Sequence, residues 1–475
     1  MLPGDPGFLE NFMDPKRWSE EEFGEVDLHD ARLDRRLLLI AQRVAESSGG
    51  TVASVFRDAA ERQGAYDFLA NDRVAWASIA SASYVATVAR CAGEEFVFVP
   101  EDGSSLSITD GARAKGTGPV GARKLGARGF QVMNSIAVSA AGVPLGVVGQ
   151  AWWTRAETPA VKSAKARTTD EKETRYWGSE MSAVRERFRD HGGGTIPWFQ
   201  LDRGGDAWPV LLEAAKEGQW VTIRSAYDRR VVEGPGGGRT YLHKTMEAAP
   251  ILGGYRLPVR GGHGRAERNA HMVVRATKVT LQMQDEASSQ AHLASVWCVW
   301  TVEVETTPAG ERPLNWMLLT TRPVRHFTDA KLTIYGYSQR WRVEEFHKAW
   351  KTGACNVEDL QLRSERAIRG WATVLAADAM RMLRMTYLAR EEPSRPATDE
   401  FTRDEIHAVY LAMSKSWDEK RIPTIGKLVA WIADIGGHSG KASGAHAGVI
   451  VLARGWDRVA PLVPVVTRLL KLQPA

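Results

Sequence analysis

The sequence predicts an α/β protein in which helical regions at both ends flank a central region that holds the strands. Apolar residues recur at helical spacing over residues 20–92. Short apolar runs bounded by glycine, proline or acidic residues occupy residues 93–322, a pattern that is typical of strands. Helical periodicity returns from residue 328 to the C-terminus.

Length and composition indicate a globular protein with more than one domain. The chain has 475 residues, of which 44% are hydrophobic and 25% are charged. A net charge of +5 slightly favours polyanionic partners. The three cysteines lie far apart and show no zinc-ligand spacing, so we expect neither a disulfide framework nor a structural zinc. The acidic, proline-broken N-terminus is not typical of a signal peptide, and we expect a cytoplasmic protein.

The N-terminal region is predicted to contain two helices. Residues 30–46 carry Arg32 and Arg36 beside an apolar stripe, and residues 60–74 form a second helix that ends at an Asn-Asp turn. The two arginines are either solvated helix charges or contacts to an anionic partner.

Two strongly apolar strands of the central region end in acidic residues: residues 95–102 end at Asp102, and residues 196–202 end at Asp202. Between them, residues 129–154 carry no charge over a length that could cross a bilayer. The Ala-Gly-Val-Pro segment at the centre of this stretch favours two strands joined in a hairpin instead. The helices expected in the same region cover residues 169–188 and 207–218.

Residues 220–322 are predicted to form short strands with glycine-rich turns and a basic surface. The histidines of this region show no ligand spacing and are expected only to add to that surface; they are His243, His263 and His271. Arg224 follows a buried strand and could cap the edge of a sheet. Trp316 lies in an apolar segment, so its structural interpretation is a side chain packed in a core.

Residues 337–353, YSQRWRVEEFHKAWKTG, are predicted to form a single amphipathic helix. Its polar stripe contains Tyr337, Arg340, Glu344, Lys348 and Lys351. Its apolar side contains Val343, Phe346, Ala349 and Trp350. One interpretation is a surface helix with intrahelical ion pairs between residues four apart. The other is a basic surface that contacts a DNA backbone around a functional carboxylate.

Asp102, Asp202 and Glu344 together predict a metal site. Oxygen-only ligands suit Mg²⁺ or Mn²⁺. Two such ions about 4 Å apart can activate water and stabilise the leaving oxygen of a phosphodiester. The cations around Glu344 would offset the repulsion between a carboxylate cluster and a polyanion. The alternative for each aspartate is to cap the turn that follows it.

The spacing Tyr-x2-Arg-x3-Glu-x6-Lys, formed by Tyr337, Arg340, Glu344 and Lys351, resembles the signature of the insertion-sequence-four family of bacterial DDE transposases. Further segments that resemble this family occur in the same order along the chain: LHDARLDRR, QGAYDFLAN, EDGSSLS, DEKETRYW, LDRGGD, PLNWMLLTTRPV and WIADIGG. The resemblance therefore covers nearly the whole chain.

This resemblance implies an RNase H-like catalytic core with a β-rich insertion, flanked by helical domains. The implied domains are a DNA-binding domain at 1–92, a catalytic domain at 93–375 with its insertion at about 220–322, and a dimerisation domain at 376–475. Asp102, Asp202 and Glu344 would be the catalytic, metal-binding residues. The implied DNA contacts are Tyr337, Arg340, Lys348, Lys351, Trp316, Arg224, Arg203, Arg32 and Arg36.

The implied function is cut-and-paste transposition. The protein would bind terminal inverted repeats of double-stranded DNA and pair two ends as a homodimer in a synaptic complex. It would then cleave the ends through hairpins and transfer strands into target DNA. Two Mg²⁺ ions per site are expected, Mn²⁺ can substitute, and no membrane partner is expected. Asp67 and Ala70 stand where a well-matched member of the family has arginines, so we expect a different repeat sequence.

Three alternatives stay open at this point. The first is a metal-dependent DNA nuclease with an RNase H-like core and no strand transfer. The second is an inactivated relative that only binds DNA. The third is a structural or protein-binding role for the basic helix.

Overall fold

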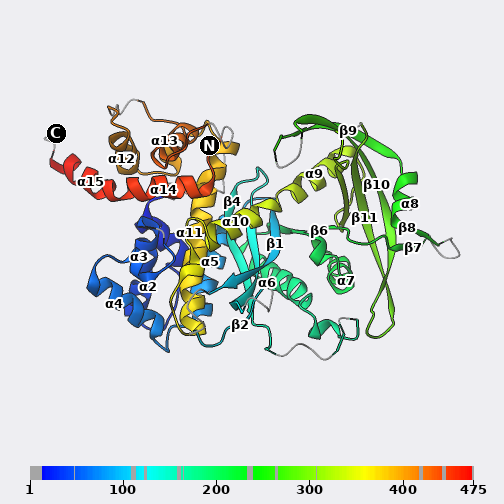
Figure 1. The fold of residues 1–475 in the computed structure, drawn as a ribbon, viewed down its shortest axis with the longest axis horizontal. Helices are drawn as coiled ribbons and strands as arrows, with labels where there is room; N and C mark the ends of the chain where they lie inside the picture. Colours follow the sequence, from blue (N-terminus) through cyan, green and yellow to red (C-terminus); the bar gives the residue numbers. More distant parts are fainter. Residues whose placement is uncertain are drawn as a thin grey trace.

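The computed structural model describes residues 13–47, 49–108, 114–121, 126–157, 162–163, 165–232, 239–262, 266–305, 307–416, 421–440 and 446–472. Within them the chain has a mixed α/β fold in which helices pack around a central sheet (Figure 1). His263, named above as part of the basic surface, lies outside the described residues.

The described strands form one mixed sheet. They are β1 (Phe96–Ser107), β2 (Gly118–Pro119), β3 (Arg128–Val138), β4 (Pro144–Trp153), β5 (Ile196–Leu201), β6 (Trp220–Arg224), β7 (Arg230–Val232), β8 (Arg239–Tyr241), β9 (Ile251–Val259), β10 (Arg268–Gln284), β11 (Ala291–Glu303) and β12 (Asn315–Thr320). The strand order is β2-β3-β1-β5-β6-β12-β11-β10-β7-β8, with β4 beside β3 and β9 beside β10. β1, β5 and β6 run parallel, and the other pairings are antiparallel.

The uncharged stretch at 129–154 forms the predicted hairpin. β3 and β4 pair antiparallel along their lengths, with Val138 opposite Pro144 at the turn. Among the described residues, no helix combines the length and the apolar character needed to cross a membrane.

The first and second parallel strands are buried on both faces, which explains their continuous apolar sequences. Phe98 of β1 and Trp198 of β5 belong to one core. Val97 and Phe199 belong to a second core on the opposite face, where α6 (Arg175–His191) and α7 (Trp208–Lys216) pack. The prediction that the first strand ends at Asp102 is wrong, because β1 continues to Ser107 through its pairing with β3.

The N-terminal helices are α1 (Pro15–Phe23), α2 (Ala31–Glu46), α3 (Val52–Val55), α4 (Ala59–Ala70) and α5 (Trp76–Arg90). α2 and α4 confirm the two predicted helices. Aspartates start several of them: Asp14, Asp30 and Asp58 each accept a backbone N–H of the first turn. Such caps satisfy donors that have no partner within the helix.

The segment at 337–353 is two helices rather than the single predicted helix. α9 (Phe327–Ser338) ends before a turn at Gln339 and Arg340, and α10 (Trp341–Lys351) begins after it. The predicted apolar side of α10 is confirmed, since Val343, Phe346, Ala349 and Trp350 are all fully buried. Tyr337 lies on α9 and is itself buried, so the five polar residues do not form one exposed stripe.

One long buried helix, α11 (Glu365–Glu391), runs through the centre of the molecule (Figure 1). It contacts α2, α4 and α5 on the N-terminal side, β4 in the sheet, and α13 (Ile425–Ile435) and α14 (Val449–Val459) on the C-terminal side. The remaining helices are α8 (Leu242–Ala248), α12 (Arg403–Ala412) and α15 (Val463–Leu472). The domain boundary expected after residue 375 would fall inside α11.

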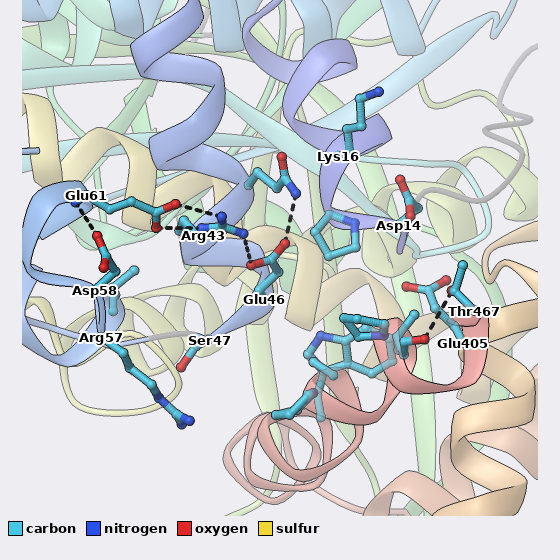
Figure 2. Close-up of a pocket in the computed structure, with 18 of the residues that line it drawn as sticks. Asp14, Lys16, Arg43, Glu46, Ser47, Arg57, Asp58, Glu61, Glu405 and Thr467 are labelled. Carbon is cyan, nitrogen blue, oxygen red and sulfur yellow. Dashed lines mark hydrogen bonds and ion pairs between the residues drawn. The ribbon is translucent and has the colours of Figure 1, made fainter. Parts of the chain in front are cut away.

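A hollow of about 750 Å³ lies where α1, α2 and α4 meet the C-terminal helices (Figure 2). Glu405 of α12 lines it and is fully buried. Its Oε2 accepts hydrogen bonds from the backbone and hydroxyl of Thr402, whereas Oε1 is buried without a hydrogen-bond partner among the described residues. Burial raises the pKa of Glu405 to about 8.

We expect Glu405 to make the protein less stable as pH rises. The folded state holds its proton up to a pKa of about 8, whereas the unfolded state releases it near the ordinary value of 4.5. The stability that this proton contributes is therefore complete below the lower pKa and lost as pH rises through the upper one. Denaturant titrations between pH 5 and 9 should show wild-type stability falling relative to Glu405→Gln, which has no proton to lose. Parallel curves for the two proteins would contradict this expectation.

Candidate active site and nucleic-acid interface

Strand register brings the two predicted aspartates together. β1 and β5 pair in parallel up to Glu101 opposite Leu201, so Asp102 and Asp202 follow at the same edge of the sheet. They share the face of Phe98 and Trp198, because side chains alternate along a strand. Burial raises the pKa of Asp102 to about 7; the like charges of Asp202 and Glu344 add to the increase, and Arg340 opposes it.

α10 places Glu344 beside Asp102 and positions a cation between them. Arg340 Nη1 lies 3.4 Å from Asp102 Oδ2, and its Nη2 lies 3.2 Å from Glu344 Oε1. The Arg340–Glu344 pair joins residues four apart, as the surface-helix interpretation predicted, although Arg340 lies at the N-cap of α10 and not inside the helix. Because the same guanidinium also contacts β1, it belongs to the carboxylate site as well.

Asp202 is held at the site by the turn that follows it. It precedes the short helix η3 (Arg203–Gly205), and its Oδ1 accepts a hydrogen bond of 2.6 Å from the Gly204 N–H. The capping role considered for this aspartate is therefore present. It leaves the second carboxylate oxygen, Oδ2, for another partner.

His347 is a member of the site that the sequence analysis missed. The ligand-capable atoms of Asp102, Glu344 and His347 lie within 4.8 Å of one another. Burial, together with the nearby charges of Lys351 and Arg340, lowers the pKa of His347 to about 3, so the ring is neutral. Its position three residues after Glu344, one helical turn along, was the signal that could have identified it.

The predicted cations on α10 occupy different environments. Lys348 is exposed. Lys351 is half-buried and lies 3.6 Å from Glu358, which also accepts the Ser107 N–H. Both remain candidates for phosphate contacts.

Trp316 lies beside Tyr337 and a small apolar cavity. The two rings meet edge to face with centroids 5.2 Å apart. The cavity has a volume of about 320 Å³ and is lined by Trp316, Tyr255, Leu257 and Met272 among others. This volume lies at the lower end of the roughly 300–1,000 Å³ typical of small-molecule sites. Tyr255 is a second residue that the sequence analysis missed.

Two further arginines lie near the same edge of the sheet. Arg224 ends β6 and donates to the carbonyl of Asn315, the residue before Trp316. Burial raises the pKa of Tyr337, and the positive charge of Arg224 opposes that increase. Arg203 is exposed and follows Asp202 directly.

Arg32 and Arg36 are not part of this site, because both lie on α2 among the N-terminal helices (Figure 1). Arg32 is exposed and pairs with Asp30 at 2.9 Å. Arg36 is half-buried and packs closely on α4 at Gly64. The contact is so close that a β-carbon added at Gly64 would lie only 2.6 Å from Arg36 Nη1.

The site is thus a carboxylate cluster at one edge of the sheet, with Arg340 between two of its members and Arg203 and Arg224 nearby. A comparison with known families is more specific. Residues 15–74, which contain α1 to α4, match the transposase DNA-binding family. This match supports a DNA-binding transposase and makes DNA the supported partner.

Proposed function

We propose that the protein is a cut-and-paste DNA transposase of the insertion-sequence-four type, with a pattern that resembles the transposase of transposon five. It cleaves transposon ends through hairpins and joins them to target DNA. One observation carries the proposal. Asp102, Asp202 and Glu344, far apart in sequence, converge at one edge of the sheet in a chain with an N-terminal transposase DNA-binding segment.

The sheet topology supports an RNase H-like core. The hairpin of β3 and β4 lies beside β1, and β5 and β6 follow in parallel, giving the order β4-β3-β1-β5-β6. The extended strands β10 and β11 lie between β6 and β12 in sequence, as expected for an inserted β-rich segment. The homodimeric synaptic complex, by contrast, rests on the family resemblance alone.

The carboxylate centre fits a hard divalent cation. Burial raises the pKa of Asp102, and the like charges of Asp202 and Glu344 add to the increase although Arg340 opposes it, so a bound cation would relieve the remaining repulsion between the carboxylates. Oxygen donors of this kind suit Mg²⁺, with Mn²⁺ as a substitute. When bound, Mg²⁺ would supply activation of water and stabilisation of the leaving oxygen.

The surrounding residues hold the DNA. Arg340, Lys348 and Lys351 would neutralise phosphates next to the cleaved bond, and Arg203 and Arg224 would extend this contact along the sheet edge. Tyr337 supports Trp316 edge to face. On α2, Arg32 and Arg36 would contact the repeat.

We expect matching inverted repeats in the DNA on either side of the gene, and a marker placed between two such repeats tests transposition directly. Excision of the marker and its integration into a second plasmid, both dependent on Mg²⁺, are the expected results. Excision without integration would favour the nuclease alternative. Binding of the repeats without cleavage would favour the inactivated relative.

Alanine at Arg340, Lys348 or Lys351 should weaken end binding across DNA sequences. Each lost phosphate contact should also make the dependence of log affinity on log salt shallower by about one unit. Fluorescence anisotropy over a salt series measures both quantities. Lys216→Ala, an exposed lysine on α7 at the other face of the sheet, should leave the slope unchanged. An unchanged slope in all three variants, with lower stability, would instead favour ion pairing within the protein as the role of these residues.

Trp316→Ala should slow hairpin formation while first-strand nicking stays near normal. A tight hairpin strains the duplex, and extruding a base relieves that strain at a cost of a few kcal/mol. Stacking on an indole could return about 1–3 kcal/mol, and the cavity beside Trp316 offers room for the extruded base. Quenched-flow assays on intact and pre-nicked ends measure the two steps separately.

Trp316→Phe, which keeps an aromatic face, should partly restore hairpin formation, and a pre-nicked end should not rescue Trp316→Ala. A folded Trp316→Ala protein that forms hairpins at the wild-type rate would contradict the stacking role. A large fall in melting temperature would instead identify core packing as the function of this indole.

A further inference from the structure

A basic hollow of about 950 Å³, called the α6 hollow below, lies where the end of β4 meets the start of α6. Its walls carry more basic than acidic side chains: Arg155, Lys162, Arg167, Lys172 and Arg175 against Asp170, Glu171 and Glu173. None of these residues belongs to α10 or to the carboxylate cluster. The excess of positive charge favours an anionic partner.

Part of this positive charge is not used within the protein. Arg155 donates two hydrogen bonds of 2.6 Å to Glu173, and Lys162 lies 2.7 Å from Glu171. Arg167 Nε is buried without a hydrogen-bond partner among the described residues. Three cations of the hollow form no ion pair with a carboxylate of the described residues: Arg167, Lys172 and Arg175. A phosphate group could therefore pair with them without breaking an ion pair of the protein.

An aromatic stack holds one wall of the α6 hollow in place. The rings of Trp153 and Tyr176 lie face to face with centroids 3.9 Å apart, and the Arg175 guanidinium lies 4.8 Å from the centre of the Tyr176 ring. Trp153 Nε1 also donates to Glu173, the acid that binds Arg155. Because these contacts already order the wall, little conformational entropy would be lost on binding.

Strand register places this stack near the carboxylate cluster. Trp153 pairs with Gln131 of β3, and Gln131 pairs with Ser105 of β1. Ser105 follows Asp102 by three residues, so Trp153 lies about 10 Å farther along the strands and about 10 Å across two of them. Successive phosphates of one DNA strand are about 3.4 Å apart along the duplex axis. A duplex with one phosphate at the carboxylates therefore has others, a few nucleotides away, at the α6 hollow.

The α6 hollow and α10 lie on opposite faces of the sheet. Trp153 and Tyr176 pack against the core that contains Val97 and Phe199. α10 packs against the other core through Val343. The hollow is therefore separate from the surface proposed above to hold the transposon end next to the cleaved bond.

The start of α6 nevertheless touches the turn that holds Asp202. Trp177 packs so closely on Gly204 that a β-carbon added there would lie 3.2 Å from the indole. Gly204 is the residue whose N–H binds Asp202. Strand transfer brings two DNA molecules to one carboxylate cluster at the same time, and the two cannot occupy one surface. The α6 hollow offers the second surface.

We infer that the α6 hollow binds the phosphate backbone of target DNA during strand transfer, with Arg167, Lys172 and Arg175 as the contacts. The inference rests on the proposed function, since strand transfer is the step that requires a second duplex. Backbone contacts carry no direct sequence information, so these residues should act equally on targets of different sequence.

Joining of pre-cleaved transposon ends to a plasmid tests the inference, because such ends need no cleavage and carry no flanking DNA. The measured quantity is the plasmid concentration that gives half-maximal joining. Arg167→Ala and Lys172→Ala should each raise it about fivefold at about 0.15 M salt, the electrostatic contribution of one phosphate contact. Each should also make its dependence on salt shallower by about one unit on logarithmic axes. Arg175 is kept, because it also supports the aromatic stack.

The controls separate charge from folding. Arg167→Lys and Lys172→Arg keep the cation and should retain most of the affinity for the plasmid, whereas Lys172→Glu should have a larger effect than Lys172→Ala. Lys216→Ala removes an exposed lysine at the last turn of α7 and should leave the plasmid dependence unchanged. Melting temperatures identify any variant that does not fold.

A photoreactive residue in place of Lys172 identifies the DNA that occupies the α6 hollow. In complexes of labelled ends with a differently labelled target duplex, it should cross-link to the target. Cross-links confined to the transposon end, or a wild-type plasmid dependence in both alanine variants, would overturn the inference and leave the transposase proposal intact. A wild-type protein that joins no ends would overturn both. Should an alanine variant fail to fold, its charge-preserving counterpart, Lys172→Glu and the cross-link still decide the question.

Discussion

Replacing Asp102, Asp202 or Glu344 with alanine should abolish nicking and joining while transposon-end binding is largely kept. Metal-assisted stabilisation contributes several kcal/mol to such reactions, and each 1.36 kcal/mol is a factor of ten in rate. The expected loss is therefore about 10³-fold or more. Affinity comes mainly from lysine and arginine contacts to phosphates. Gel assays of cleavage and binding on one labelled end measure both properties.

Glu345 supplies the matched control for Glu344. It lies next in sequence but faces α11, where it accepts a hydrogen bond from the Tyr387 hydroxyl. Because alanine would remove that bond from a largely buried position, Glu345→Gln is the better test. It should cleave at close to the wild-type rate. An inactive Glu345→Gln together with an active Glu344→Gln would show that the site has been placed on the wrong side of α10.

Arg381→Met should destabilise the protein by about 3–5 kcal/mol, the cost of breaking a buried ion pair on one side. Arg381 is fully buried and pairs with Asp378 at 3.0 Å. It also donates to the carbonyls of Met13 and Ala45, at 3.0 Å and 2.6 Å. Its guanidinium thus joins α11 to the start of α1 and the end of α2. Denaturant unfolding of both proteins measures the difference.

Arg189→Met is the control for this prediction. Arg189 lies on α6, and its side chain is 69% exposed beside Asp190. Exposed ion pairs contribute roughly 0–1 kcal/mol, so this variant should unfold close to wild type. Equal effects at the two positions would show that Arg381 does not hold the helices together.

The parts of the fold that the sequence predicted well are those in which local pattern and burial agree. The strand at 196–202 and the hairpin at 129–154 have apolar sequences because both faces of each strand are covered. α2 has a strong apolar stripe and a capping aspartate. In such segments the neighbours in sequence already determine which side chains are buried.

The wrong predictions concern places where contacts between residues far apart in sequence determine where a helix or strand ends. No proline separates Tyr337 from Glu344, yet the helix breaks at Gln339, and the Tyr337 ring packs against Trp316. β1 passes Asp102 because β3 continues beside it. The role of α11 was missed for the same reason, since its buried arginines bind carbonyls hundreds of residues away.

The candidate site shows the same division. The carboxylates were identified from strand ends and from a family spacing, both of which are visible along the chain. His347 and Tyr255 were not, because their significance depends on partners from other elements: Asn134 of β3 for the first and Trp316 of β12 for the second. Periodicity assigns a residue to a face but does not reveal what faces it.

The parallel register of β1 and β5 also restricts how this chain can change in length. Asp102 faces α10, whereas its neighbour Glu101 is buried near Glu180 of α6 on the other face. Removing one residue from β1 before this point would turn Asp102 toward the α6 face and Glu101 toward the α10 face, because a one-residue slip turns every side chain to the opposite face. Asp102 would then face the opposite core, away from Glu344, although the composition of the chain had barely altered. Insertions and deletions that keep the carboxylates together must therefore fall in the connections between these strands.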